Sequence, residues 1–151
     1  MEVSGEITVV RPVEETYRAL IDPQWVAQAV PGIRQVTAVP TTDPRSVACE
    51  LQWELGTAMM RVQFSGVVTW RQDEPPRRLE LAIRGTGSTG PLDLTLQVIL
   101  QAQATTTVIR YRGQGEGPEA SHWKSKVMEP VARFMVQKLV ESLARNGGAP
   151  R

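Results

Sequence analysis

The C-terminal part of the chain, from about residue 119 to residue 145, has the spacing of one long amphipathic helix. Its apolar residues recur every three or four positions and so share one stripe of a helix: Val127, Met128, Val131, Ala132, Met135, Leu139 and Leu143. Polar residues fall on the opposite side. A helix with one apolar stripe needs a second layer to bury it, so the rest of the chain must supply that layer.

Pro130 interrupts this pattern, because a proline inside a helix removes one hydrogen bond and clashes with the preceding turn. It lies on the polar side, and we expect it to bend one continuous helix around the fold. The alternative is two helical segments, with Pro130 in the first turn of the second. Asn146 and the two glycines after it can end the helix. A chain of 151 residues predicts a single domain, residues 1–146, and we expect a short flexible tail at 147–151.

The rest of the chain predicts mostly strands, because apolar and polar residues alternate along it. Residues 2–10 form a first strand, and about six more follow between residues 33 and 115. Gly66 and Gly85 fall inside two of them and mark places for bends or bulges. Short turns between consecutive strands indicate an antiparallel sheet.

Two short helices separate the first strand from the others. Pro12 suits the start of the first, and Asp22 with Pro23 has the N-cap and first-position pattern of the second. The GTGSTG stretch at residues 85–90 lies between two strands and lacks the Gly-Lys-Ser/Thr ending of a phosphate loop, so it predicts a hairpin turn. The order of elements predicts an α+β fold with a curved antiparallel sheet of about seven strands.

Three stretches resemble the carbon monoxide dehydrogenase G-subunit family, within the START-like helix-grip (SRPBCC) superfamily. They are SGEITVVRPVEETYRALIDPQWVAQAVPG at 4–32, FSGVVTWRQDEPPRRLEL at 64–81 and the GTGSTG turn. The resemblance implies a helix-grip fold, in which the sheet wraps around the long C-terminal helix and leaves an apolar cavity. It also implies a role beside molybdenum hydroxylases of the carbon monoxide dehydrogenase type, in recruiting them to the membrane or in carrying quinone.

The residues expected to line the concave face are aromatic, aliphatic or thioether side chains, which suit a planar or flexible apolar guest. These candidate lining residues are Trp25, Ala29, Ile33, Trp53, Met60, Phe64, Leu81, Leu96, Tyr111, Met128 and Met135. The alternative interpretation is that they fill a solid core. Tyr111 is either a hydrogen-bonding group for a ligand carbonyl or an ordinary buried tyrosine.

The sequence offers no convincing set of catalytic groups, and we expect neither an enzyme nor a bound metal or cofactor. General acid–base catalysis needs a positioned titratable group, and the inward strand positions carry almost none. His122 is the one histidine and Cys49 the one cysteine of the chain, too few ligands for zinc. Cys49 is expected to be a small buried hydrophobe. The roles of His122 and Cys49 stay open.

Composition excludes several classes of partner and location. A net charge of +1 without a basic block argues against nucleic acid. One cysteine allows no internal disulfide, which suits the cytoplasm. The N-terminus does not have the pattern of a signal peptide, and no apolar run is long enough to span a bilayer. We expect a cytoplasmic protein; peripheral contact at the inner membrane face and a homodimer are both left open.

We therefore predict a non-catalytic protein that binds or carries a quinone or lipid for a carbon monoxide dehydrogenase-type molybdenum hydroxylase, or recruits that enzyme. Two alternatives remain. One is an enzyme of the polyketide cyclase or aromatase kind, which needs a polar group deep in the pocket. The other is a protein-interaction domain with a filled core.

Overall fold

The computed structural model describes residues 2–56, 61–87, 90–116 and 137–143. It has the elements β1 (Glu2–Val9), α1 (Val13–Leu20), α2 (Pro23–Ala29), β2 (Ile33–Val39), β3 (Ser46–Gly56), β4 (Arg61–Glu74), β5 (Arg78–Gly87), β6 (Gly90–Gln103) and β7 (Thr106–Glu116). A further helical segment covers residues 137–143. The α+β helix-grip architecture predicted from the sequence is confirmed.

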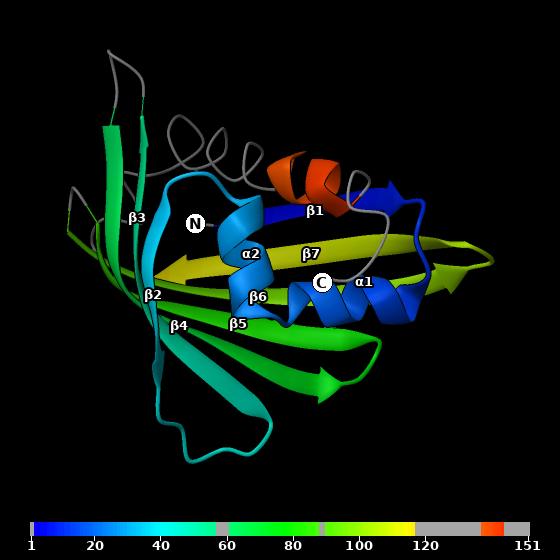
Figure 1. Cartoon of the computed structure of the whole chain (residues 1–151), viewed down its shortest axis with the longest axis horizontal. Coiled ribbons are helices and arrows are strands. Elements are labelled where there is room, and N and C mark those ends of the chain that lie inside the picture. The colour runs from blue at the N-terminus through cyan, green and yellow to red at the C-terminus, as the bar shows by residue number, and fades with distance from the viewer. Residues whose placement is uncertain (1, 57–60, 88–89, 117–136, 144–151) are drawn as a thin grey trace.

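The strands form one seven-stranded antiparallel sheet in the order β1-β7-β6-β5-β4-β3-β2. Strands β2 to β6 each pair with the next strand along the chain, whereas β1 pairs with β7. Gly87 of β5 pairs with Gly90 of β6, so the predicted hairpin at the GTGSTG stretch is confirmed. Figure 1 shows the sheet curving around α1, α2 and the helical segment 137–143, which all lie on its concave side.

Gly66 of β4 pairs with Gly85 of β5, and neither position has room for a side chain. A Cβ atom at Gly66 would overlap the carbonyl oxygen of Arg84, and a Cβ atom at Gly85 would overlap that of Ser65. The two backbones therefore approach more closely than any residue with a side chain would allow. The strand register is regular at this pair, and the register shift between β4 and β5 lies between Gln72 and Glu74, so the predicted bulge is not at the glycines.

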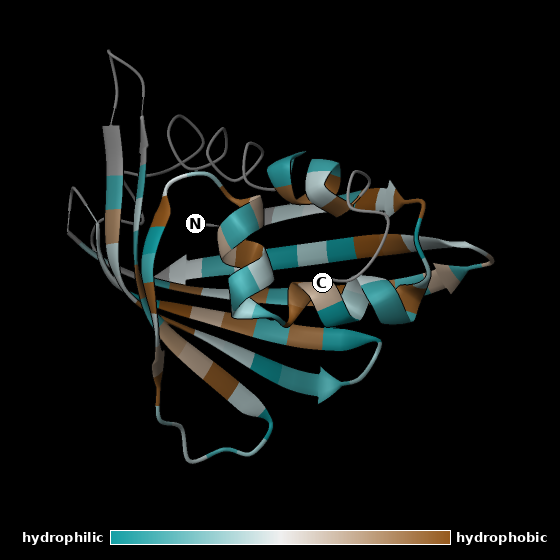
Figure 2. Cartoon of the chain, in the orientation of Figure 1, coloured by the Kyte–Doolittle hydropathy of each residue, from teal (hydrophilic) through white to brown (hydrophobic). Residues whose placement is uncertain are grey.

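Apolar and polar side chains alternate between the two faces of the sheet, as predicted. On β3, Cys49 and Leu51 are buried while Glu50 and Gln52 are exposed. Figure 2 shows the same alternation as brown and teal bands along the strands. The concave face is therefore the apolar one, and the helices cover it because their own apolar residues need burial there.

The two short helices begin close to the predicted positions. The Asp22 side chain accepts a hydrogen bond of 3.0 Å from the backbone N–H of Gln24, and Pro23 is the first residue of α2. Helix α1 begins at Val13, one residue later than expected, with Pro12 at its N-cap position. Tyr17 of α1 is buried, and its hydroxyl donates a hydrogen bond of 3.3 Å to the carbonyl oxygen of Arg78. This contact fixes α1 to β5.

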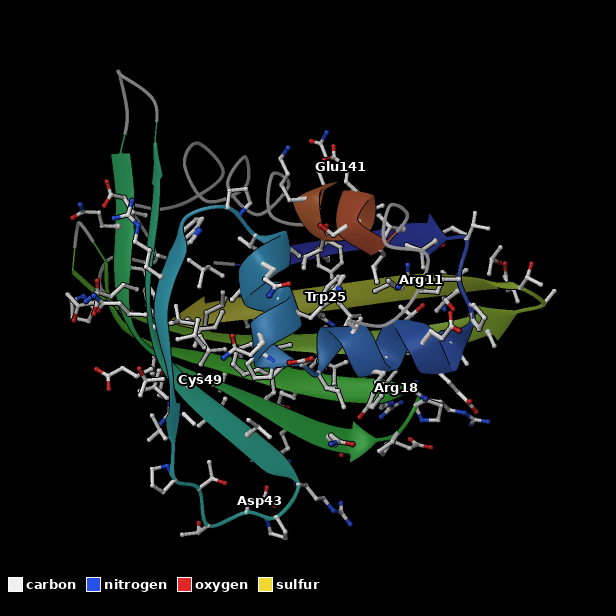
Figure 3. The ribbon with its side chains drawn as sticks, viewed as in Figure 1. Arg11, Arg18, Trp25, Asp43, Cys49 and Glu141 are labelled. Atoms are coloured by element: carbon white, nitrogen blue, oxygen red, sulfur yellow. The ribbon has the colours of Figure 1, made fainter. Side chains whose placement is uncertain are left out.

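The helical segment 137–143 presents the predicted apolar stripe to the sheet. Leu143 is 1% exposed and belongs to the core, and Leu139 packs against that core. Glu141 lies on the polar side, where its carboxylate is 3.4 Å from the ammonium of Lys138, and Figure 3 shows Glu141 pointing away from the sheet. The rest of the predicted helix, with Pro130, and the predicted tail 147–151 lie outside the described residues.

The apolar interior has two centres. The first cluster comprises Val9, Tyr17, Ala19, Trp25, Ala29, Leu79, Val98, Leu100, Ile109 and Leu143. The second cluster comprises Cys49, Leu51, Phe64, Val68 and Trp70, all from β3 and β4. Val26 of α2 and Leu81 of β5 pack against both clusters. The first cluster thus lies under the helices, and the second lies where the sheet curves.

Candidate functional site

The described candidate lining residues contribute to the interior but do not form one ring around a cavity. Trp25 and Ala29 are buried members of the first cluster, and Phe64 is a buried member of the second. Ile33 and Trp53 are partly buried against the second cluster. These five residues are therefore shared between the two clusters, as residues of a filled core would be.

Leu81, Leu96 and Tyr111 pack against the first cluster yet stay partly exposed, as Ile33 and Trp53 do against the second. Met60, Met128 and Met135 lie outside the described residues, so their predicted place at the site stays a prediction. A guest molecule needs accessible apolar surface, and the partly exposed residues are therefore the ones that define the candidate site.

Leu81 and Leu96 belong to an apolar patch on the concave side of β5 and β6. Leu81 pairs with Leu96 and Ile83 pairs with Leu94, so the four side chains share one face and lie side by side. All four are partly exposed. We call this set, Leu81, Ile83, Leu94 and Leu96, the β5–β6 patch. The sequence analysis missed Ile83 and Leu94, although both fall in the same alternating series as the two leucines it selected.

Gly113 of β7 lies beside this patch, opposite Leu96 in the strand register. A Cβ atom at Gly113 would be 3.2 Å from the Cδ1 atom of Leu96, so the missing side chain makes room for that leucine. Tyr111, two residues earlier on the same strand, pairs with Gly5 of β1 and with Val98 of β6. Tyr111 therefore stands next to the β5–β6 patch on the concave side.

Trp53 is held at the far end of β3 by the loop after α2. Its indole N–H donates a hydrogen bond of 3.0 Å to the carbonyl oxygen of Pro31. The backbone N–H of Glu54 donates one of 3.1 Å to the carbonyl oxygen of Gly32, whose φ is 92°. A Cβ atom at Gly32 would overlap the Glu54 carbonyl oxygen, so glycine is needed for this attachment.

The concave face carries little that can ionise. Among the described strand residues, the positions that face the helices carry only two titratable groups, the thiol of Cys49 and the phenol of Tyr111. Burial raises the pKa of Cys49 and keeps it a neutral thiol. Within the described ranges, no three His, Cys, Asp or Glu side chains gather to hold a metal ion. His122 lies outside those ranges.

Arg11 is a buried charged residue that the sequence analysis did not single out. It is 2% exposed, and its guanidinium donates a hydrogen bond to the carbonyl oxygen of Leu143. Its own carbonyl oxygen accepts one of 2.7 Å from the Thr107 hydroxyl. Burial lowers the pKa of Arg11, while nearby Glu15 raises it, and an arginine stays charged under all ordinary conditions. Arg11, which follows β1, therefore joins this end of the strand to β7 and to the helical segment 137–143.

A hollow of about 340 Å³ lies on the opposite, outer face of the sheet. Most of its lining comes from outward-facing polar residues of β2 to β5, namely Arg34, Gln52, Glu54, Gln63, Ser65 and Thr86. Trp53, Phe64 and Gly87 complete the lining. The hollow therefore brings together two of the predicted lining residues, Trp53 and Phe64, with polar residues of the outer face.

Solved structures share this architecture. A conserved protein from Geobacillus kaustophilus has a TM-score of 0.78 and 16% identity, with coverage of 97% of this chain and 94% of that one. The structure of Ara h 8.0201 has a TM-score of 0.71 and 12% identity, covering 95% of each chain. The di-domain aromatase/cyclase StfQ of steffimycin biosynthesis has a TM-score of 0.67 and 11% identity; the match covers 96% of this chain and 44% of StfQ. At these identities the likeness concerns the fold alone.

Sequence comparison identifies the family. No curated protein matches the chain. In the described part of the structure, no helix combines the length and apolar character needed to cross a membrane. The sequence profile of one family, however, matches residues 5–146, nearly the entire chain. The protein therefore belongs to the carbon monoxide dehydrogenase G-subunit (CoxG) family.

Proposed function

We propose that this CoxG-family protein binds an apolar small molecule, a quinone or a lipid, between its sheet and its helices. It would act without catalysis, as a carrier or recruitment protein for a carbon monoxide dehydrogenase-type molybdenum hydroxylase. The observation that carries the proposal is the β5–β6 patch, whose four aliphatic side chains face the helices yet remain partly exposed.

Partial exposure matters because large aliphatic side chains on the concave side of such a sheet are normally covered by the core. Covering apolar surface contributes about 25 cal/mol for each Å² removed from water. A guest lying on the β5–β6 patch would gain this free energy, and the partly buried Trp53 and Ile33 extend the apolar surface toward β3. The patch therefore suits a flat or flexible hydrocarbon better than a polar metabolite.

The same face supports a carrier better than an enzyme. Its titratable groups in the described strands are a buried neutral thiol, Cys49, and the phenol of Tyr111. Neither has a second titratable side chain among the concave strand positions, whereas acid–base catalysis uses positioned groups in complementary roles. The CoxG family name points to carbon monoxide dehydrogenase as the partner. We propose that the exchange takes place in the cytoplasm, with peripheral contact at the inner membrane face.

The proposal is tested by extracting the purified protein with organic solvent and identifying any isoprenoid or lipid by mass spectrometry. A quinone analogue is then titrated into the apo protein while tryptophan fluorescence is followed. We expect saturable binding in the wild type. The Leu96→Trp variant should lose it, because the larger side chain occupies the β5–β6 patch.

The matched control is Gln97→Trp, one residue away on the outer face of β6, where the side chain is exposed. This variant should bind like the wild type. Absence of any extracted guest and of binding by the added quinone would contradict the proposal. Turnover of a polyketide substrate, abolished by Tyr111→Phe, would favour the cyclase alternative instead.

A further inference from the structure

We infer that the Arg11 guanidinium is a conformational switch with two alternative acceptors, which controls whether the helical segment 137–143 lies against the sheet. In the docked state it donates to the carbonyl oxygen of Leu143. When the segment is released, the guanidinium pairs instead with the carboxylate of Glu15. This switch operates independently of any guest on the concave face.

The backbone of Arg11 is fixed at both of its polar groups. Its N–H donates a hydrogen bond of 3.0 Å to the carbonyl oxygen of Val9, and its carbonyl oxygen accepts one of 2.7 Å from the Thr107 hydroxyl. Thr107 is itself buried on β7, which pairs with β1. The side chain is therefore the part of Arg11 that can turn from one acceptor to another without disturbing the sheet.

The docked guanidinium is only partly satisfied. Arg11 is 2% exposed, and its Nη1 atom is buried without a hydrogen-bond partner among the described residues. The Leu143 carbonyl is a neutral acceptor, whereas buried charges are normally paired with an opposite charge. Burial accordingly lowers the pKa of Arg11. The docked state thus carries the cost of a buried cation, and release of the segment removes that cost.

A carboxylate lies near Arg11 without being its acceptor. Glu15, four residues further along the chain in the first turn of α1, raises the pKa of Arg11 against the larger effect of burial. Glu15 is partly exposed, and Arg11 donates to Leu143 rather than to it. A guanidinium forms a stronger hydrogen bond with a carboxylate than with a neutral carbonyl. Once Arg11 is free of Leu143, Glu15 is therefore the acceptor that it meets.

The helical segment also loses little polar stabilisation when it is released. Water takes the place of Arg11 at the Leu143 carbonyl, because solvent satisfies an exposed backbone carbonyl. Among the described residues, release is opposed by the buried side chain of Leu143 and by the packing of Leu139 and Val140 against the first cluster. Docking therefore depends on a few apolar contacts, and the partners of Arg11 can shift its equilibrium.

Amide hydrogen exchange of the full chain, followed by NMR at neutral pH without added guest, measures this release. Helices without tertiary packing are marginal in water, so a released segment loses its protection. Glu15→Gln should slow exchange of residues 139–143 about 2- to 5-fold, because the released state loses a partly exposed ion pair. Val98 and Ile109, buried in the sheet, should exchange as in the wild type.

Glu14→Gln is the matched control. Glu14 is exposed in the same turn of α1, so its substitution removes the same favourable interaction with the helix dipole. This variant should leave the exchange of residues 139–143 unchanged. In an Arg11→Met background, Glu15→Gln should also have no effect, because the residue through which it acts is gone.

Three outcomes would overturn the switch. They are unchanged or faster exchange in Glu15→Gln, equal slowing by Glu14→Gln, and slowing by Glu15→Gln that persists in the Arg11→Met background. The two glutamate variants decide the question by themselves if Arg11→Met does not fold.

Discussion

The two apolar clusters differ in how the chain holds them together. The first, under the helices, is bordered by hydrogen bonds between distant segments: Arg11 to Leu143, Thr107 to Arg11 and Tyr17 to Arg78. The second, on β3 and β4, has one such bond at its edge, from Trp53 to Pro31, and otherwise depends on apolar contacts and the strand ladder. Each cluster also has one buried side-chain nitrogen without a partner among the described residues: Nη1 of Arg11 beside the first and the indole N–H of Trp70 in the second.

This difference indicates that the two clusters have different roles. Side-chain hydrogen bonds fix the geometry of the first cluster and attach α1 and the helical segment 137–143 to the sheet. The second cluster and the neighbouring β5–β6 patch rely on non-directional contacts, which tolerate rearrangement better. We therefore expect stability to depend mostly on the first cluster and guest binding mostly on the patch.

The strongest test of this division compares two leucines that face the same side of the sheet. Leu79 is 2% exposed in the first cluster, and Leu96 is partly exposed in the patch. Leu79→Ala should lower the free energy of unfolding by about 2–5 kcal/mol, because it leaves a cavity. Leu96→Ala should cost about 1 kcal/mol, because a partly exposed side chain loses less burial. Urea denaturation measures both.

Quinone titration of the same variants completes the test. Leu96→Ala should change the dissociation constant more than Leu79→Ala does, measured where both variants are folded. Equal losses of stability, with equal effects on binding, would show that the two regions form one uniform core.

The hydrogen bond from Arg11 gives a second, smaller test. Arg11→Ala should lower the free energy of unfolding by about 1–3 kcal/mol, because the Leu143 carbonyl loses its partner. Arg11→Met should cost less, since an apolar side chain of similar length avoids burying a charge. Denaturation of Arg18→Ala, an exposed arginine on α1, serves as the control. If Arg11→Ala lowers the free energy of unfolding no more than Arg18→Ala does, the hydrogen bond from Arg11 to Leu143 does not stabilise the first cluster.

The pH dependence of stability gives the smallest expected effect. Burial raises the pKa of Cys49 above its ordinary value of 9.0 and that of Tyr17 above 10.0, where nearby Asp73 adds to the shift. The folded state therefore holds these protons more tightly than the unfolded state. Their contribution is complete below about pH 9 and is lost as the pH rises toward the folded pKa values.

Urea denaturation between pH 8 and pH 11 measures this loss of stability in the wild type and in variants that change one residue of each cluster. Cys49→Ala should remove the part that begins near pH 9, and Tyr17→Phe the part that begins near pH 10. An alkaline loss of stability that is unchanged in both variants would have to come from other groups.

The sequence predicted the features that depend on neighbours in the chain. The N-cap of Asp22, the hairpin at GTGSTG and the alternating faces of β3 follow from spacing within a few residues. Cys49 is buried, as its place on an apolar strand face predicts. Local propensity and alternation suffice for such features because no distant contact decides them.

The missed features depend on segments that meet only after folding. The contact of Arg11 with Leu143 joins residues 132 positions apart. Tyr111 lies over Gly5 because β1 pairs with β7, and alternation alone does not reveal that register. The candidate lining residues were chosen as one set for the same reason: the sequence shows which side chains face inward but not which inward residues are covered.

The glycine pair between β4 and β5 has a consequence for how such a protein can diversify. The close approach of the two strands there needs two positions without side chains, Gly66 and Gly85, whereas the apolar patch is made by leucine and isoleucine residues elsewhere. The path of the backbone and the chemistry of the lining side chains therefore depend on different residues. Substitutions of the lining side chains can change which guest is bound while the backbone stays the same.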